Sequence, residues 1–194
     1  MKKVALDEIV GLERYEQIRD EFRRRIIELK KHRRVSVGAV VTFVFENHDT
    51  MLFQTQEMLR AEHIVDLDKI REELDVYNEL VPDRDELSST MLIEITESGK
   101  IRDTLVGLIG IDRAVRMQIG DAIAVPGEFE GGRTKDDNVS AVQYVRFKFD
   151  ERARQAFVEG RTPVRLVIDH PRYRHSTPIE GAGRESLVAD LTGP

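Results

Sequence analysis

The spacing of apolar residues predicts a helical N-terminal segment followed by a strand or hairpin. From Asp7 to Arg34 apolar residues recur at steps of three and four, which predicts one or two helices, with Gly11 between a short first helix and a longer one. The recurring residues are Leu12, Tyr15, Ile18, Phe22, Ile26 and Leu29. Over Val35–Phe45 every second residue is apolar, which predicts a long strand or a hairpin folded near Gly38.

The rest of the chain predicts helices and strands in mixed order. Helices are expected over Thr50–Ile64 with Asp49 or Thr50 as the cap, from Asp66 to Val76 or Tyr77, over Lys100–Ile109, from Asp150 to Glu159 and over Glu185–Leu191. Strands are expected over Ser89–Thr96, Arg113–Ile119, Ala122–Val125, Val139–Phe149 and, as the last strand, Pro163–Ile168, with a glycine-bearing loop over Pro126–Asn138.

This order of elements indicates the fold class. Strands that follow one another as antiparallel neighbours, with helices clustered early and scattered later, favour an α+β fold. We expect a mostly antiparallel sheet with N-terminal helices and a helical insertion packed on it. A length of 194 residues favours a single α+β domain over residues 1–194, with an N-terminal helical segment over 1–34 and an extended tail with a short helix over 176–194.

Composition and charge narrow the function classes. The chain has no cysteine, which excludes disulfides, thiolate metal sites, iron–sulfur ligation by this chain and cysteine nucleophiles. A formal net charge of -6 argues against a nucleic-acid partner. Charged residues and Gly11 interrupt Met1–Leu12, so no signal peptide is expected, and Val35–Phe45 is too short to cross a bilayer as a helix. We therefore expect a cytoplasmic protein without a membrane partner, and its oligomeric state stays open.

A polar stripe between apolar neighbours runs along the expected helix over Thr50–Ile64. At about 100° per residue, Thr50, Gln54, Glu57 and Ala61 fall on one line, with apolar residues on both sides of it. A carboxylate covered by such neighbours must be paired, protonated or bound to a cation, because a lone buried charge is costly. Glu57 is therefore a site candidate. A local ion pair between Glu57 and Arg60 is the structural alternative.

A second polar segment follows the last expected strand. Asp169 and His170 come together where Pro171 ends the strand, and Tyr173 and His175 follow. These residue types fit a metal site or a His–Asp acid–base pair. The structural alternative is that Asp169 caps the turn and Tyr173 packs on the sheet.

We expect the two polar segments to meet in one pocket. The pocket candidates are Thr50, Gln54, Glu57, Arg60, Asp169, His170, Tyr173 and His175. Glu57, Asp169, His170 and His175 are the candidate ligands of a divalent metal, for which iron, zinc and manganese suit these donors. Their spacing matches no standard metal template, so the cofactor stays unknown.

The far end of the first helical segment is basic. The candidate anion-binding residues there are Arg23, Arg24, Lys30, Lys31, Arg33 and Arg34. The structural alternative is a solvated helix end, because cations near a helix C-terminus are favoured by the helix dipole.

Several segments occur together in a recognisable order. Thr50–Glu62, Glu73–Pro82 and Ile168–His175, with Lys30–Arg34 and Leu108–Ile111, resemble an uncharacterised bacterial family, the domain of unknown function 3501. The resemblance implies no established activity. Genes of that family often lie beside those of a rubrerythrin-like protein and an iron–sulfur oxidoreductase, which implies an accessory role in peroxide or redox defence with these proteins as partners.

Three functions follow from these observations. We favour an accessory or binding protein of a bacterial redox module. The first alternative is a metal-dependent enzyme of unknown substrate that uses the His, Asp and Glu candidates. The second is an anion- or nucleic-acid-binding regulator that uses the Arg23–Arg34 cluster.

Overall fold

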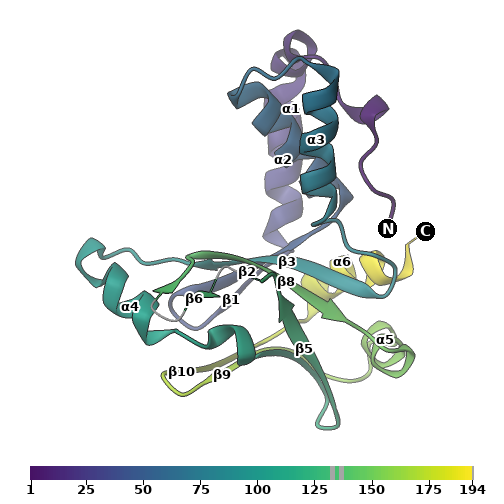
Figure 1. The fold of residues 1–194 in the computed structure, drawn as a ribbon. Coiled ribbons are helices and arrows are strands. Elements are labelled where there is room, and N and C mark those ends of the chain that lie inside the picture. Colours follow the sequence, from purple (N-terminus) through teal and green to yellow (C-terminus); the bar gives the residue numbers. More distant parts are fainter. Residues whose placement is uncertain (132–133, 136–137, 194) are drawn as a thin grey trace.

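The structure, a computed structural model, describes residues 1–131, 134–135 and 138–193. Within these residues an antiparallel sheet of eight strands has the order β1-β2-β3-β8-β5-β4-β9-β10 (Figure 1). Its strands are β1 (Arg34–Val37), β2 (Val41–Glu46), β3 (Glu86–Ile93), β4 (Val115–Ile119), β5 (Ile123–Phe129), β8 (Val142–Lys148), β9 (Val164–His170) and β10 (Tyr173–Pro178). Two short strands, β6 (Thr134–Lys135) and β7 (Asn138–Val139), pair with each other.

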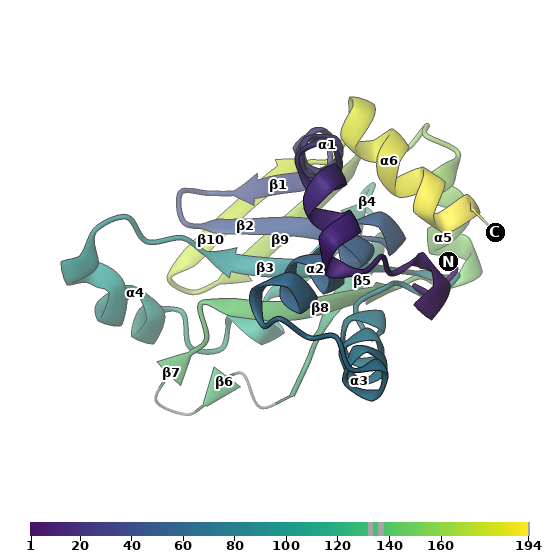
Figure 2. The same ribbon diagram turned by 90° about the horizontal axis from the view of Figure 1, so that it is seen from above.

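The helices fall into two groups around this sheet. A bundle on one face of the sheet is formed by the long helices α1 (Leu12–Lys31), α2 (His48–Ala61) and α3 (Leu67–Asn78) (Figures 1 and 2). The shorter helix α4 (Ile101–Gly107) lies at one end of the sheet, and α5 (Glu151–Val158) and α6 (Gly181–Thr192) lie at the opposite end. Single turns of 3-10 helix are η1 (Leu6–Glu8), η2 (Ser98–Lys100) and η3 (Ile111–Arg113). No helix in the described ranges has the length and apolar character needed to cross a bilayer.

The sheet curls until its first and last strands approach each other, which gives it a nearly closed barrel shape. The Tyr173 hydroxyl on β10 donates to the Val37 carbonyl oxygen at 2.7 Å and accepts from the Val40 amide at 3.0 Å. Thr177 adds a second link, because its hydroxyl donates to the Ser36 carbonyl oxygen at 2.7 Å. Side-chain hydrogen bonds from β10 to the β1–β2 hairpin thus hold the two edges together.

Successive side chains along each strand point alternately into and out of the barrel, and the side chains that point inward are apolar. Fully buried examples are Phe43 and Phe45 on β2, Met91 on β3, Phe147 on β8 and Leu166 on β9. A separate, smaller apolar cluster holds the bundle together, formed by Val4, Met51, Leu59, Ile70, Leu74 and Val81. The outer face of β2, β3 and β8 therefore lies between the apolar core of the barrel and the apolar cluster of the helical bundle.

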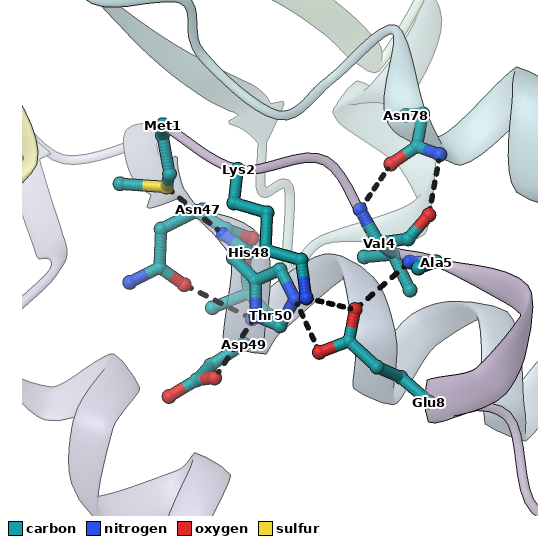
Figure 3. Close-up of polar contacts among 10 residues, drawn as sticks. All are labelled: Met1, Lys2, Val4, Ala5, Glu8, Asn47, His48, Asp49, Thr50 and Asn78. Carbon is teal, nitrogen blue, oxygen red and sulfur yellow. Dashed lines mark hydrogen bonds and ion pairs between the residues drawn. The ribbon is translucent and has the colours of Figure 1, made fainter. Parts of the chain in front are cut away.

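The N-terminal segment ties the bundle together through polar contacts (Figure 3). The Val4 amide donates to the Asn78 side chain at 2.8 Å, and Asn78 donates back to the Val4 carbonyl oxygen. His48 lies between two carboxylates, 3.1 Å from Glu8 and 3.3 Å from Asp49. A hydrogen bond from the Ala5 amide, followed by the contact with His48, lowers the pKa of Glu8.

The α+β class, the antiparallel sheet and the N-terminal helices are confirmed. Gly11 does separate η1 from α1, and the apolar segment after α1 is the hairpin β1–β2. Asp66 and Asp150 cap α3 and α5 with their side chains.

Three local expectations are wrong. The cap of α2 is Asn47, whose side chain accepts from the Thr50 amide, instead of Asp49 or Thr50. Pro163–Ile168 is not the last strand, because β10 pairs with β9 across a two-residue turn. The expected loop over Pro126–Asn138 begins with the second half of β5, whose Pro126 pairs with Arg116. Within that loop, 132–133 and 136–137 lie outside the described residues.

Candidate functional site

Glu57 joins α2 to α1. Its carboxylate accepts hydrogen bonds from Nε of Arg19 at 2.7 Å, from Nη2 of Arg19 at 2.8 Å and from the Tyr15 hydroxyl at 2.8 Å. The hydrogen bonds from Arg19 outweigh partial burial and lower the pKa of Glu57. Burial and the nearby carboxylate raise the pKa of Tyr15. The carboxylate is thus paired, as the sequence requires, and its partners belong to another helix.

The other pocket candidates on α2 have separate partners. Arg60 pairs with Glu16 on α1 at 2.6 Å, so the local pair between Glu57 and Arg60, the structural alternative, is replaced by two pairs between helices. The Thr50 hydroxyl donates to the Asn47 carbonyl oxygen and helps to begin the helix. Gln54 points toward the sheet and donates to the Glu46 carboxylate at 3.4 Å. The polar stripe is therefore buried only at Thr50, is partly buried at Gln54 and Glu57 and is exposed at Ala61, and its members serve different contacts.

The candidates of the second segment lie on the β9–β10 hairpin. His170 is buried, its Nε2 lies 2.9 Å from the Ile109 carbonyl oxygen, and its Nδ1 accepts from the Arg172 amide. These contacts fit the neutral tautomer with the proton on Nε2. Tyr173 packs on the sheet with its hydroxyl in the barrel closure, and the His175 ring packs against it with centroids 4.4 Å apart and planes tilted by 59°.

Asp169 is on the outside of the same hairpin. Its carboxylate lies 3.7 Å from Nη1 of Arg116 and 3.4 Å from Nε of Arg174, and about half of the side chain is exposed. Since Asp169 and His170 are consecutive strand residues, they point to opposite faces of the sheet. They form no acid–base pair, and Asp169 does not cap the turn.

The structure does not bring the two polar segments into one pocket. Glu57 is in the helical bundle above the sheet, whereas the β9–β10 hairpin lies on the far side of the barrel (Figure 1). Among the described residues, no three His, Asp or Glu side chains gather in an arrangement that could hold a metal ion. The proposed ligand set of Glu57, Asp169, His170 and His175 is therefore not assembled.

The basic residues of the first helical segment divide into paired and unpaired groups. Arg33 is almost fully buried and donates to Asp190, Ser186 and the carbonyl oxygens of Phe45 and Glu46, so it is not available to an external anion. Lys31 pairs with Glu28 and Arg34 pairs with Glu94.

By contrast, Arg23, Arg24 and Arg25 are exposed on α1 and make no ion pair within the described part of the chain. Arg24 and Arg25, but not Arg23, line a surface hollow of about 570 Å³ whose other lining residues are the apolar Ile18 and Phe22 and the acidic Glu21 and Glu28. The Arg25 guanidinium lies over the Phe22 ring at 4.9 Å. This part of α1 combines free positive charge with accessible apolar surface, and we call it the α1 face.

The sequence reasoning missed a polar row on the outer face of the sheet. Glu46, Ser88, Arg146 and Glu128 occupy directly paired positions on β2, β3, β8 and β5. The signal was present in the alternation of polar with apolar residues along Tyr144–Lys148. Only the register of the strands shows that these positions form one row.

The comparisons with known proteins agree with the resemblance. The model of the family described as "Protein of unknown function (DUF3501)" matches residues 3–191. The chain belongs to this family. It is also similar to a solved structure, a novel protein of unknown function from Burkholderia pseudomallei K96243, with 32% identity and a TM-score of 0.91 over 98% of this chain and 100% of that chain. No curated protein matches.

Proposed function

We propose that this DUF3501 protein is a cytoplasmic accessory protein that docks, through the α1 face, on an acidic surface of a partner in a bacterial redox module. The partners we propose are the rubrerythrin-like protein and the iron–sulfur oxidoreductase that the family resemblance implies. The observation that carries this proposal is the presence of two adjacent, exposed arginines, Arg24 and Arg25, that form no ion pair among the described residues and line a hollow with an apolar part.

Charge supports an acidic partner. The whole chain is acidic, with a net charge of -6, yet Arg23, Arg24 and Arg25 gather on one exposed helix. Such a local field attracts a negatively charged surface and orients it during association. The neighbouring basic residues Arg19, Lys31 and Arg34 are already neutralised by carboxylates of this chain.

The apolar lining supports a protein partner over a nucleic acid. Aromatic and arginine side chains dominate the binding energy of protein interfaces, and Phe22 with Arg25 supplies both types. A partner that places an aliphatic or aromatic side chain in the hollow and carboxylates around it would use all of these groups.

Titration calorimetry with the two purified partners tests the proposal. We expect saturable binding of at least one of them that weakens as salt is added. The double variant Arg24→Glu with Arg25→Glu should weaken that binding by about tenfold or more, because a reversed charge at an interface repels an acidic partner. Arg152→Glu is the matched control, since Arg152 is an exposed arginine on α5. No binding at low salt, or equal weakening by the control, would refute the proposal.

A further inference from the structure

We propose that a small organic cation, a primary amine, binds in a cavity between the end of α3 and the outer face of the sheet. This cavity has a volume of about 190 Å³ and lies between Leu80, which follows α3, and the polar row of β3, β8 and β5. The site is separate from the α1 face and does not depend on the docking proposal.

Ser88 is the residue that points to a guest molecule. It lines the cavity, is only 1% exposed, and its hydroxyl has no hydrogen-bond partner among the described residues. Buried hydroxyls almost always have a partner, so this one is available to a molecule in the cavity. A protonated amine donates hydrogen bonds, and a serine hydroxyl can accept one.

The charges around the cavity favour a cation. Glu79, Glu128 and Glu130 line it together with Arg146, and Glu128 is paired with Lys148 at 2.6 Å. The positive charge of Arg146 is already used, because its guanidinium donates to the Glu86 carboxylate at 2.7 Å and to the Glu79 carbonyl oxygen. The Glu79 side chain, in contrast, forms no ion pair within the part of the chain that the structure describes. A guest therefore meets a free carboxylate, whereas the guanidinium is committed to the protein.

The size and the walls of the cavity restrict the body of the guest. Leu80 and Phe129 supply apolar surface beside the polar groups. Since a water molecule occupies about 30 Å³ of liquid, the volume corresponds to about six waters and suits a short alkyl chain with one charged end. An ammonium group near Ser88 and Glu79, with its alkyl chain against Leu80 and Phe129, uses both kinds of surface.

Three probes with the same four-carbon body test this site: n-butylamine, n-butanol and butyrate. Binding is followed by amide chemical shifts of the full-length protein during titration. We expect saturable shifts around Ser88 and Leu80 with n-butylamine at millimolar concentrations, as befits a ligand of so few atoms, and at least tenfold weaker binding of n-butanol and butyrate.

Two variants and one control complete the experiment. Ser88→Ala and Glu79→Gln should each weaken n-butylamine binding by about threefold to tenfold. Glu72→Gln, an exposed glutamate elsewhere on α3, should leave it unchanged. Absence of saturable shifts, equal binding of the three probes, or full binding by the Ser88→Ala variant would each overturn the proposal. These variants leave α1 unchanged, so partner docking through the α1 face should be the same in them as in the wild-type protein.

Discussion

The guanidinium of Arg19 and the carboxylate of Glu57 meet side by side, with two nitrogen–oxygen distances of 2.7 and 2.8 Å. The two residues lie 38 positions apart in the chain and connect α1 with α2. About a quarter of each side chain is exposed, so the pair is partly protected from water. A bidentate ion pair of this kind fixes the relative positions of two helices more firmly than a surface ion pair with a single hydrogen bond does.

Removing the charge of Glu57 should destabilise the protein. The substitution Glu57→Gln removes the counter-charge of the partly buried Arg19 and weakens the hydrogen bond from Tyr15. We expect the free energy of unfolding at neutral pH to fall by about 1–3 kcal/mol. Urea denaturation measures the loss. Glu62→Gln, at an exposed glutamate that ends α2, is the control and should change stability by less than about 0.5 kcal/mol.

The contribution of Glu57 should disappear in acid. The hydrogen bonds from Arg19 hold the pKa of Glu57 below 4.5 in the folded protein. An acid with a lowered folded pKa stabilises the fold fully above its unfolded pKa, and this stabilisation is lost as the pH falls through the folded pKa. The stability difference between wild type and Glu57→Gln should therefore be constant from about pH 7 to about pH 5 and shrink below about pH 4.5. A difference that grows in acid would contradict this assignment.

Local chemistry explains why so many elements could be predicted from the sequence. Asp66 and Asp150 cap their helices through amides two or three residues away, so the signal lies within a few positions. Alternation in Val35–Phe45 predicted the strands, although all residues of β2 are buried on both faces, and Gly38 marks the turn between them. β10 was missed because its exposed residues are polar and its link to the rest of the sheet is made by Tyr173.

Long-range partners explain the errors at the candidate site. A carboxylate such as Glu57 shows by its pattern that it must be paired, but the sequence does not reveal that Arg19 is the partner. Arg33 follows Lys30, Lys31 and His32 in a basic segment and has the same local pattern as an exposed cation. Its burial is set by Asp190, which lies 157 positions away on α6. Spacing along one element predicts a residue's face, whereas its partner depends on how the elements pack.

The buried pair of Arg33 and Asp190 should be essential to the fold. Both side chains are at most 5% exposed, and Arg33 also donates to the ends of β2 through Phe45 and Glu46. The substitution Asp190→Ala leaves a buried guanidinium without its counter-charge, which costs about 3–5 kcal/mol. Thermal unfolding followed by circular dichroism measures the effect. Glu185→Ala, at an exposed position of α6, should be close to neutral, and equal losses in both variants would refute the role of the pair.

Closure of the barrel should depend on the absence of a side chain at Gly38. Its φ of 73° is strained for any residue with a Cβ, and a Cβ placed there would lie 2.5 Å from the Tyr173 hydroxyl and 2.7 Å from the His175 ring. Gly38→Ala must therefore push Tyr173 away from the β1–β2 hairpin, and we expect a loss of about 2 kcal/mol or more with a clear fall in Tm. Gly99→Ala is the control, because nothing lies within 4 Å of its added Cβ. If Gly38→Ala unfolds at the same temperature as Gly99→Ala, the contact of Tyr173 with the hairpin does not hold the barrel edges together.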